Sequence, residues 1–289
     1  MLLSSDLVAN LRRLVPLDAP IRIVDVGASD IHAVERPSYD PLLAHQLGYL
    51  TAFEPNLSEF ARLESSEARR YLPYAIGDGS DTPFHITLSP GLCSTLQPNA
   101  GLLKHLKTLN RVSKVVSKST MSTHRLDDLA EVGEIDFLKI DIQGGELKVF
   151  EGGRKQLSNV LCVQTEVAFV PLYEGQPLFA EQDAMLQSLG LRFYGMTSVN
   201  RFPLVGTPRN ALGKHRRNDI GQWVDGDALF IRDFTEWEKL PYPSLKRLFF
   251  ILALCFPAVS ATLSIARRLV SAGQFPKDLY ERLEAEASR

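Results

Sequence analysis

The sequence predicts an α/β fold, with a mainly parallel β-sheet, helices on both of its faces and a helical segment at the C-terminus. From Ile21 to about residue 196, short β-rich runs alternate with stretches of helix length. This alternation is typical of βαβ units. Beyond residue 233 the pattern turns helical. We therefore divide the chain into an N-terminal helix over 1–20, a main domain over 21–233 and a helical appendage over 234–289.

Individual elements follow from hydrophobic periodicity and turn residues. Strands are predicted over 21–26, 49–53, 71–78, 83–88, 135–142, 160–167, 191–196 and 226–233, the last at a sheet edge. Helices are predicted over 41–48, 57–70, 145–158 and 179–190. Residues 93–124 are predicted to form a basic loop region with one helix near 100–109. Residues 1–15 are expected to form a short amphipathic helix, because charged side chains interrupt the apolar core that a signal peptide needs.

Composition excludes several classes of protein. The net charge of −2 gives no reason to expect a nucleic-acid partner, and the basic run at 213–219 is interpreted as a solvated loop. The three cysteines, Cys93, Cys162 and Cys255, lie far apart. They form neither a zinc-binding pattern nor a disulfide framework, so no metal is assigned and a reducing cytoplasm is the expected location.

One C-terminal stretch does not fit an ordinary soluble helix. Residues 245–269 carry no charge between Arg247 and Arg267, which is about the length of a bilayer span. Pro257 interrupts the stretch, and serine and threonine dilute it. The preferred interpretation is a buried or interface-forming helix pair broken at Pro257, and the alternative is a membrane-associated hairpin or span. This segment is the expected place for any peripheral membrane or oligomer contact.

Acidic residues mark the ends of the predicted strands. In an open parallel sheet, ligands bind at the carboxyl ends of the strands, near the point where strand order reverses. The residues at these ends are Asp25, Gly27, Glu54, Asp78, Asp141 and Glu166. Carboxylates repel a phosphate ligand. They suit a ligand that carries hydroxyls, an amine or a cation.

The first strand runs into "DVGASD", which contains a single glycine, Gly27. A dinucleotide site uses three glycines to bring a pyrophosphate against backbone N–H groups, so a nicotinamide dehydrogenase is disfavoured. Glu54, after the second strand, is placed to accept both hydroxyls of a ribose. S-adenosylmethionine combines a nucleoside without phosphates with a sulfonium and an ammonium that tolerate Asp25 and Asp30 nearby.

The segment "IDFLKIDIQGGELKVFEGG", residues 135–153, closely resembles the signature of the FkbM family of S-adenosylmethionine-dependent methyltransferases. The pieces "VDVGASD", "FEPN", "YAIGD" and "HRLDDL" agree in order, and the resemblance covers about residues 20–233. It implies a class I methyltransferase fold, a Rossmann-like sheet of seven strands with the last antiparallel. It also implies, in the usual case, O-methylation of a sugar or natural-product hydroxyl.

The resemblance also implies roles for individual residues. Asp25 and Gly27 would contact the methionine part of S-adenosylmethionine, Glu54 its ribose and Asp78 its adenine. Asp141 would bind the acceptor, act as the base or ligate a cation, with His124 and Glu166 as further base candidates. Simpler interpretations stand beside these roles: Asp78 as a turn residue, and Asp141 as the cap of a helix that begins near Gly144.

The expected partner is a small-molecule or glycan acceptor, bound by the segments 93–123 and 194–225. A patch of Lys214 to Arg217 with Trp223 is a candidate acceptor contact. The alternative function is a non-catalytic binding or scaffold module in glycan assembly or at a membrane. Two features motivate it: the "GASD" loop, in which Ser29 and Asp30 stand where many members of the family resemble "DVGANxG", and the apolar C-terminal stretch.

Overall fold

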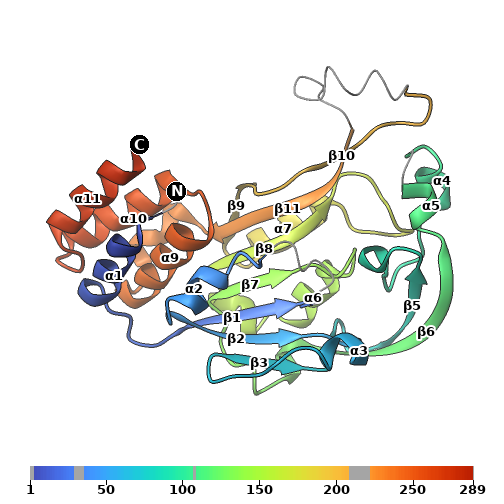
Figure 1. The fold of residues 1–289 in the computed structure, drawn as a ribbon, viewed down its shortest axis with the longest axis horizontal. Coiled ribbons are helices and arrows are strands. Elements are labelled where there is room, and N and C mark those ends of the chain that lie inside the picture. The colour runs from blue at the N-terminus through green and yellow to red at the C-terminus, as the bar shows by residue number, and fades with distance from the viewer. Residues whose placement is uncertain (1–2, 29–35, 107–108, 208–221, 289) are drawn as a thin grey trace.

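A computed structural model describes residues 3–28, 36–106, 109–207 and 222–288. Its main element is an eight-stranded sheet with the order β10-β11-β8-β7-β1-β2-β3, in which β9 also pairs with β11 (Figure 1). These strands are β1 (Ile21–Val26), β2 (Gly48–Phe53), β3 (Arg69–Leu72), β7 (Phe137–Ile140), β8 (Cys162–Ala168), β9 (Leu191–Met196), β10 (Asn200–Phe202) and β11 (Gln222–Arg232).

Five neighbouring strands of this sheet, from β3 to β8, are parallel. The late strand β11 is antiparallel to β8. The α/β fold with a mostly parallel sheet and an antiparallel late strand is therefore confirmed. Strand order reverses between β1 and β7, so the expected ligand position is beyond the carboxyl ends of these two strands.

The predicted edge position of residues 226–233 is wrong. The strand β11 lies between β8 on one side and β9 and β10 on the other. Its apolar run from Ala228 to Ile231 is buried, as an interior strand requires. The last strand in the sequence is thus inserted into the sheet and does not extend its edge.

The predicted helix over 57–70 is also wrong. The structure has a four-residue helix, α3 (Leu57–Phe60), and then turns that lead into β3. The hydroxyls of Ser65 and Ser66 accept hydrogen bonds from the backbone N–H groups of Tyr71 and Ala68. Such local bonds offer the backbone an alternative to a helix.

The predicted strand over 71–78 divides at Pro73 into β3 and β4 (Ala75–Ile76). Strand β4 belongs to a second sheet with the order β4-β6-β5, where β5 spans Asp81–Thr87 and β6 spans Val115–His124. The ten-residue β6 lies in the region predicted to be a loop. Half of its side chains are exposed serine, threonine and lysine, so the apolar alternation that predicts a strand is missing.

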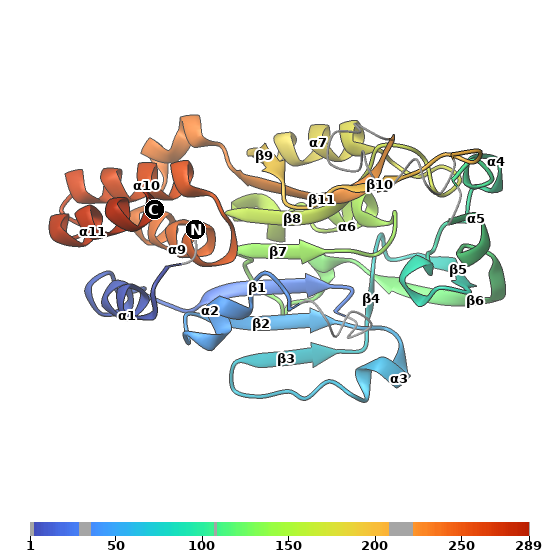
Figure 2. The same ribbon diagram turned by 45° about the horizontal axis from the view of Figure 1, so that its top comes forward.

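Helices cover both faces of the large sheet (Figures 1 and 2). On one face, α2 (Asp40–Ala44) and α9 (Tyr242–Cys255) join the same core cluster as α1 (Ser5–Leu14). On the other face, α6 (Glu146–Gly152) and α7 (Phe179–Ser188) form a second cluster.

The C-terminal segment forms α9, α10 (Val259–Ser271) and α11 (Lys277–Ala287). The predicted helix pair broken at Pro257 is confirmed, since α9 ends at Cys255 and α10 starts at Val259. Phe249 and Phe250 of α9 are fully buried in the cluster that also contains residues of the sheet. Within the described residues, every helix is too short or too polar to cross a membrane.

The two ends of the large sheet carry different structures (Figures 1 and 2). The helices α1 and α9–α11 lie at the end where the parallel strands begin, and both chain termini lie there. The small sheet, α4 (Ala100–Leu103) and α5 (Leu109–Val112) lie at the end where these strands terminate. The described parts of the segments expected to bind an acceptor therefore lie mainly on the side of the carboxyl ends.

Candidate active site

One face of the sheet changes from apolar to polar along the strands. Side chains alternate between the faces of a strand, and directly paired residues share a face. Asp25 pairs with Lys139 and Glu166 with Asp227. On this face the buried apolar residues Ile21, Ile23, Phe137, Cys162, Leu229 and Ile231 give way to Asp25, Lys139, Gln164, Glu166, Asp227 and Asp225. The polar half of this face lies at the carboxyl ends of the strands.

Asp25, the first of these polar residues, is bound by the chain itself. Its buried carboxylate accepts a hydrogen bond from the Tyr39 hydroxyl (2.7 Å), and it pairs with the Lys139 ammonium (3.2 Å). Burial lowers the pKa of Lys139, but Asp25 and Asp141 outweigh this effect and raise it overall. The Asp25 carboxylate thus fixes β1, β7 and the start of α2 together. Its contact with a cofactor stays a prediction.

Gly27 forms the tight turn at the end of β1. Its φ of +90° favours glycine, and a Cβ at this position would lie 2.2 Å from the Asp141 carbonyl oxygen. The N–H groups of Gly27 and Ala28 donate to the Phe53 carbonyl oxygen at 3.1 and 3.0 Å. The ends of β1, β2 and β7 therefore meet at this glycine. Ser29 and Asp30 of the same loop lie outside the described residues.

Glu54 follows β2 and is 5% exposed. Its Oε1 accepts a hydrogen bond of 2.7 Å from the N–H of Asn56, the residue that caps α3. Within the described part of the chain, Oε2 has no such partner. Burial is the main cause that raises the pKa of Glu54. One oxygen of this carboxylate is available to a ligand hydroxyl.

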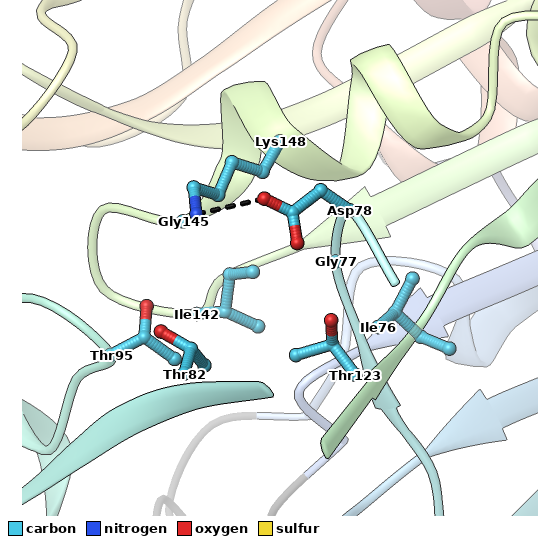
Figure 3. A pocket seen from close by; sticks show the side chains of 9 residues that line it. All are labelled: Ile76, Gly77, Asp78, Thr82, Thr95, Thr123, Ile142, Gly145 and Lys148. Carbon is cyan, nitrogen blue, oxygen red and sulfur yellow. Dashed lines mark ion pairs between the residues drawn. The ribbon is translucent and has the colours of Figure 1, made fainter. Parts of the chain in front are cut away.

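Asp78 lies at the rim of a pocket beyond β4 and β7 (Figure 3). Ile76, Gly77, Ile142 and Gly145 form part of its lining. The Asp78 carboxylate pairs with the Lys148 ammonium at 2.9 Å, and a hydrogen bond from this ammonium is the main cause that lowers the pKa of Asp78. The acid at the rim of this pocket thus already has a cationic partner.

Three carboxylates converge beyond the ends of β7 and β8. One oxygen from each of Asp141, Glu146 and Glu166 lies within 4.8 Å of the others. The Gln143 amide lies between two of them, and its Nε2 donates to Asp141 Oδ1 (2.9 Å) and to both oxygens of Glu166 (3.0 Å each). Three carboxylates at this spacing could hold a divalent cation. Among the residues that the structure describes, nothing beyond the acids themselves points to an ion, so we assign no metal.

Glu146 and Glu166 hold their protons more tightly than free carboxyls. Burial is the largest cause and the Asp141 charge a smaller one: together they raise the pKa of Glu146 to about 7 and that of Glu166 well above 4.5. Glu146 Oε1 also accepts hydrogen bonds from the N–H groups of Ile142 and Gly144 at 3.0 and 3.1 Å. Glu146 can therefore exchange a proton near neutral pH.

The third base candidate, His124, lies elsewhere. It ends β6, and its ring packs against Tyr74 with centroids 4.8 Å apart. In the described ranges His124 has no contact with the three carboxylates. The structure thus brings Asp141 and Glu166 together and leaves His124 apart, and the catalytic roles of all three stay predictions.

Insertions close over the carboxylates from the side of the small sheet. Leucines of α4 and α5 pack with Leu172, Tyr173 and Val224 in a third core cluster. The Ser94 hydroxyl donates to the Gln143 carbonyl oxygen (2.7 Å), which joins the segment after β5 to the site. Trp223 is 37% exposed on the same side and contacts Arg201, whose guanidinium carbon lies 5.7 Å from the indole centroid. Lys214 to Arg217 lie outside the described residues.

Sequence reasoning missed the partners that hold the acids in place. Lys139 is a charged residue within the otherwise apolar run of residues 137–140, and this charge was the available signal for a polar face. Tyr39 and Tyr173 give no comparable signal. Their hydroxyls reach Asp25 and Gln143 only because of long-range packing.

Comparisons with known proteins agree with this architecture. Residues 25–193, more than half of the chain, match the family model of the methyltransferase FkbM domain. None of the curated proteins compared with the chain matches it.

Several solved structures are similar at low identity. Magnesium protoporphyrin IX methyltransferase from Synechocystis PCC 6803 with bound SAM is 12% identical over 79% of this chain and 77% of that chain, with a TM-score of 0.37. Methyltransferase FkbM from Methylobacillus flagellatus KT is 11% identical over 80% of this chain and 56% of that chain, with a TM-score of 0.38. A putative tRNA methyltransferase from Streptococcus pneumoniae is 13% identical over 99% and 97%, with a TM-score of 0.36. No conclusion about substrate rests on these likenesses.

Proposed function

Because the chain belongs to the FkbM family of S-adenosylmethionine-dependent methyltransferases, we propose that it methylates a hydroxyl group of a saccharide or related natural product. The observation that carries this proposal is the convergence of Asp141 and Glu166 at the carboxyl ends of β7 and β8, next to the point where strand order reverses between β1 and β7. This is the position where a doubly wound sheet binds its ligands.

Three features fit S-adenosylmethionine, which supplies an electrophilic methyl group when bound. At Gly27 the backbone packs so closely against the Asp141 carbonyl oxygen that only glycine fits, which brings the end of β1 next to the residue that follows β7. Glu54 keeps one carboxylate oxygen for the ribose hydroxyls. The pocket beside Asp78 and Ile142 is the proposed adenine position (Figure 3).

Asp141 is the proposed base. Transfer to an alcohol oxygen requires that the hydroxyl be held in line with the methyl group and that its proton be removed. Asp141 directly follows β7, and its carbonyl oxygen faces Gly27. Its carboxylate would accept the hydroxyl proton, while Glu166 orients the acceptor through a hydrogen bond. The proton would then pass to solvent or to the neighbouring acids.

A polyhydroxylated acceptor suits the composition of this edge. Asp141, Glu166 and Asp225 offer carboxylate oxygens, which are strong acceptors for hydroxyl groups. An exposed tryptophan such as Trp223 offers a flat apolar surface to the C–H face of a sugar ring. An anionic acceptor would be repelled by the same acids.

Two measurements test the proposal. Calorimetry with S-adenosylhomocysteine should detect binding, and a screen of glycans with isotopically labelled S-adenosylmethionine should detect methyl transfer to an oxygen. No binding by the wild-type protein at millimolar S-adenosylhomocysteine would reject the enzymatic role. Methyl transfer only to nitrogen or carbon atoms would support a methyltransferase activity but would reject the proposed O-methylation.

The second candidate is a non-catalytic binding or scaffold module. Asp25 and Asp78, two of the acids expected at a cofactor, are already paired with Lys139 and Lys148. This pairing favours a site closed by its own side chains. The module would bind a glycan without S-adenosylhomocysteine, whereas the enzyme needs both ligands.

A further inference from the structure

Gln143 lies at the centre of the acid group and uses every polar atom of its side chain. Its amide nitrogen has two hydrogens, and two carboxylates accept them: Asp141 at 2.9 Å and Glu166 at 3.0 Å. The two acids come from the ends of adjacent strands, β7 and β8. A single amide therefore spans the gap between them.

The amide has only one favourable orientation. Its Oε1 accepts a hydrogen bond of 3.0 Å from the Tyr173 hydroxyl, which also lies 3.2 Å from the Leu92 carbonyl oxygen. Rotating the amide by half a turn would place its oxygen against two carboxylates and its nitrogen against Tyr173. The surrounding groups thus fix which end faces the acids.

The backbone at Gln143 adopts a conformation that is rare for this residue type. Its φ is 61°, in the left-handed region. Such a conformation persists only where neighbours hold it. The Ser94 hydroxyl does so by donating to the Gln143 carbonyl oxygen (2.7 Å), and the Leu96 N–H in turn donates to Ser94 Oγ (2.9 Å).

The choice of a neutral donor has an electrostatic consequence. A lysine or arginine between the same acids would bind them more strongly but would cancel their charge. The glutamine amide donates two hydrogen bonds and leaves the negative charge of the group in place. A cationic sulfonium or an acceptor hydroxyl can therefore still be attracted to these acids.

We propose that Gln143 is the positioning residue of the methyl-transfer site, which sets the separation and orientation of Asp141 and Glu166 without neutralising them. The positioning of the two acids stands on the contacts alone. Its effect on catalysis rests on the proposed function. The experiment below separates these two parts.

The first measurement needs no acceptor. The full chain, labelled at the glutamate carboxyl carbons, is titrated by NMR, and the variant Glu166→Gln identifies the Glu166 signal by its loss. In Gln143→Asn the shorter amide cannot bridge the acids, while asparagine tolerates a positive φ. The variant removes a hydrogen-bond donor from the ionised Glu166 carboxylate. The pH at which Glu166 is half titrated should therefore rise by about one unit.

The acids that face Glu166 are unchanged in this variant. Asp141, Glu146, Asp225 and Asp227 all keep their charges, so a shift reports the loss of the amide bridge between Asp141 and Glu166. If Gln143→Asn does not fold, Tyr173→Phe removes the hydroxyl that orients the amide and should shift the same signal in the same direction. Unchanged titration of Glu166 in a folded variant would overturn the proposal.

The second measurement uses methyl transfer to an acceptor found in the glycan screen. Gln143→Asn should lower kcat by ~10-fold or more and leave the KM for S-adenosylmethionine unchanged. Gln143→Glu places a carboxylate where a donor is needed. It should be nearly inactive at pH 8 and regain activity toward pH 6, where the protonated side chain can donate one hydrogen bond.

A loop residue with a purely structural role would give a different result. Both variants would then lower activity equally at every pH, through loss of folded protein. If the wild-type protein binds no S-adenosylhomocysteine, the proposed function fails, and the titration still decides whether Gln143 positions the acids.

Discussion

The charge of Asp141 is the property on which the proposed chemistry depends. Replacing Asp141 with Asn keeps the shape and an oxygen that can accept from the Gln143 amide, but removes the charge. If Asp141 is the base, the rate of methyl transfer should fall by ~10² or more, while calorimetry finds the affinity for S-adenosylhomocysteine little changed. Near-normal turnover of Asp141→Asn would move the role to Glu166 or His124.

Glu54 allows a separate residue-scale test of the ribose assignment. In Glu54→Ala, two hydroxyls lose a charged acceptor, and the affinity for S-adenosylhomocysteine should weaken by ~2 kcal/mol, or roughly 30-fold. Glu64→Ala is the matched control, because Glu64 is exposed in the turn that follows α3. Equal affinities of the two variants would remove the ribose assignment.

At the scale of single elements, the start of α6 should make stability depend on pH. Glu146 belongs to its first turn, and its pKa is raised to about 7, mainly by burial. The folded state then binds a proton that the unfolded state releases near pH 4.5. The contribution of this proton to the free energy of unfolding is fully present below about pH 4.5. It is lost as the pH rises through about 7, and the loss is at most ~1.4 kcal/mol per pH unit.

Thermal unfolding between pH 5 and 8 measures this effect. In Glu146→Gln, the amide oxygen can still accept from Ile142 and Gly144, and the decline of Tm with pH should become shallower. Glu151→Gln is the control, since Glu151 is exposed on the same helix. An equally steep decline in both variants would show that Glu146 does not hold the proton.

The sequence predicts elements well where one signal dominates. The strands β1, β2, β7 and β8 combine apolar runs with turn residues, and the acids at their ends follow directly from the chain order. Strand β6 fails this criterion, because its exposed serines and threonines show no apolar face. The amide of Gln143 and its partner Tyr173 could not be assigned, since their contact joins residues that only the tertiary fold brings together.

At the scale of the whole molecule, one sheet separates two different environments. Helices α1 and α9–α11 cover the end where the parallel strands begin, and the insertions cover the end with the carboxylates (Figures 1 and 2). Asp136, at the start of β7, pairs with Arg22 and with Arg247 of α9 at 2.9 and 3.2 Å. The C-terminal helices are thus joined to the strands that carry the proposed site.

This arrangement predicts that the C-terminal helices and the sheet unfold together. Phe249 of α9 is fully buried, contacts Phe275 with ring centroids 5.3 Å apart, and shares a core cluster with Ile23 and Phe137 of the sheet. Phe249→Ala should therefore lower the free energy of unfolding by ~3–5 kcal/mol. Tyr242→Ala, at an exposed position of the same helix, should change it by no more than ~0.5 kcal/mol.

Calorimetric unfolding of both variants should show one transition, because a core shared between helix and strand cannot be lost in parts. A separate early transition in Phe249→Ala, with the transition of the sheet unmoved, would mean that residues 234–289 fold as an independent unit.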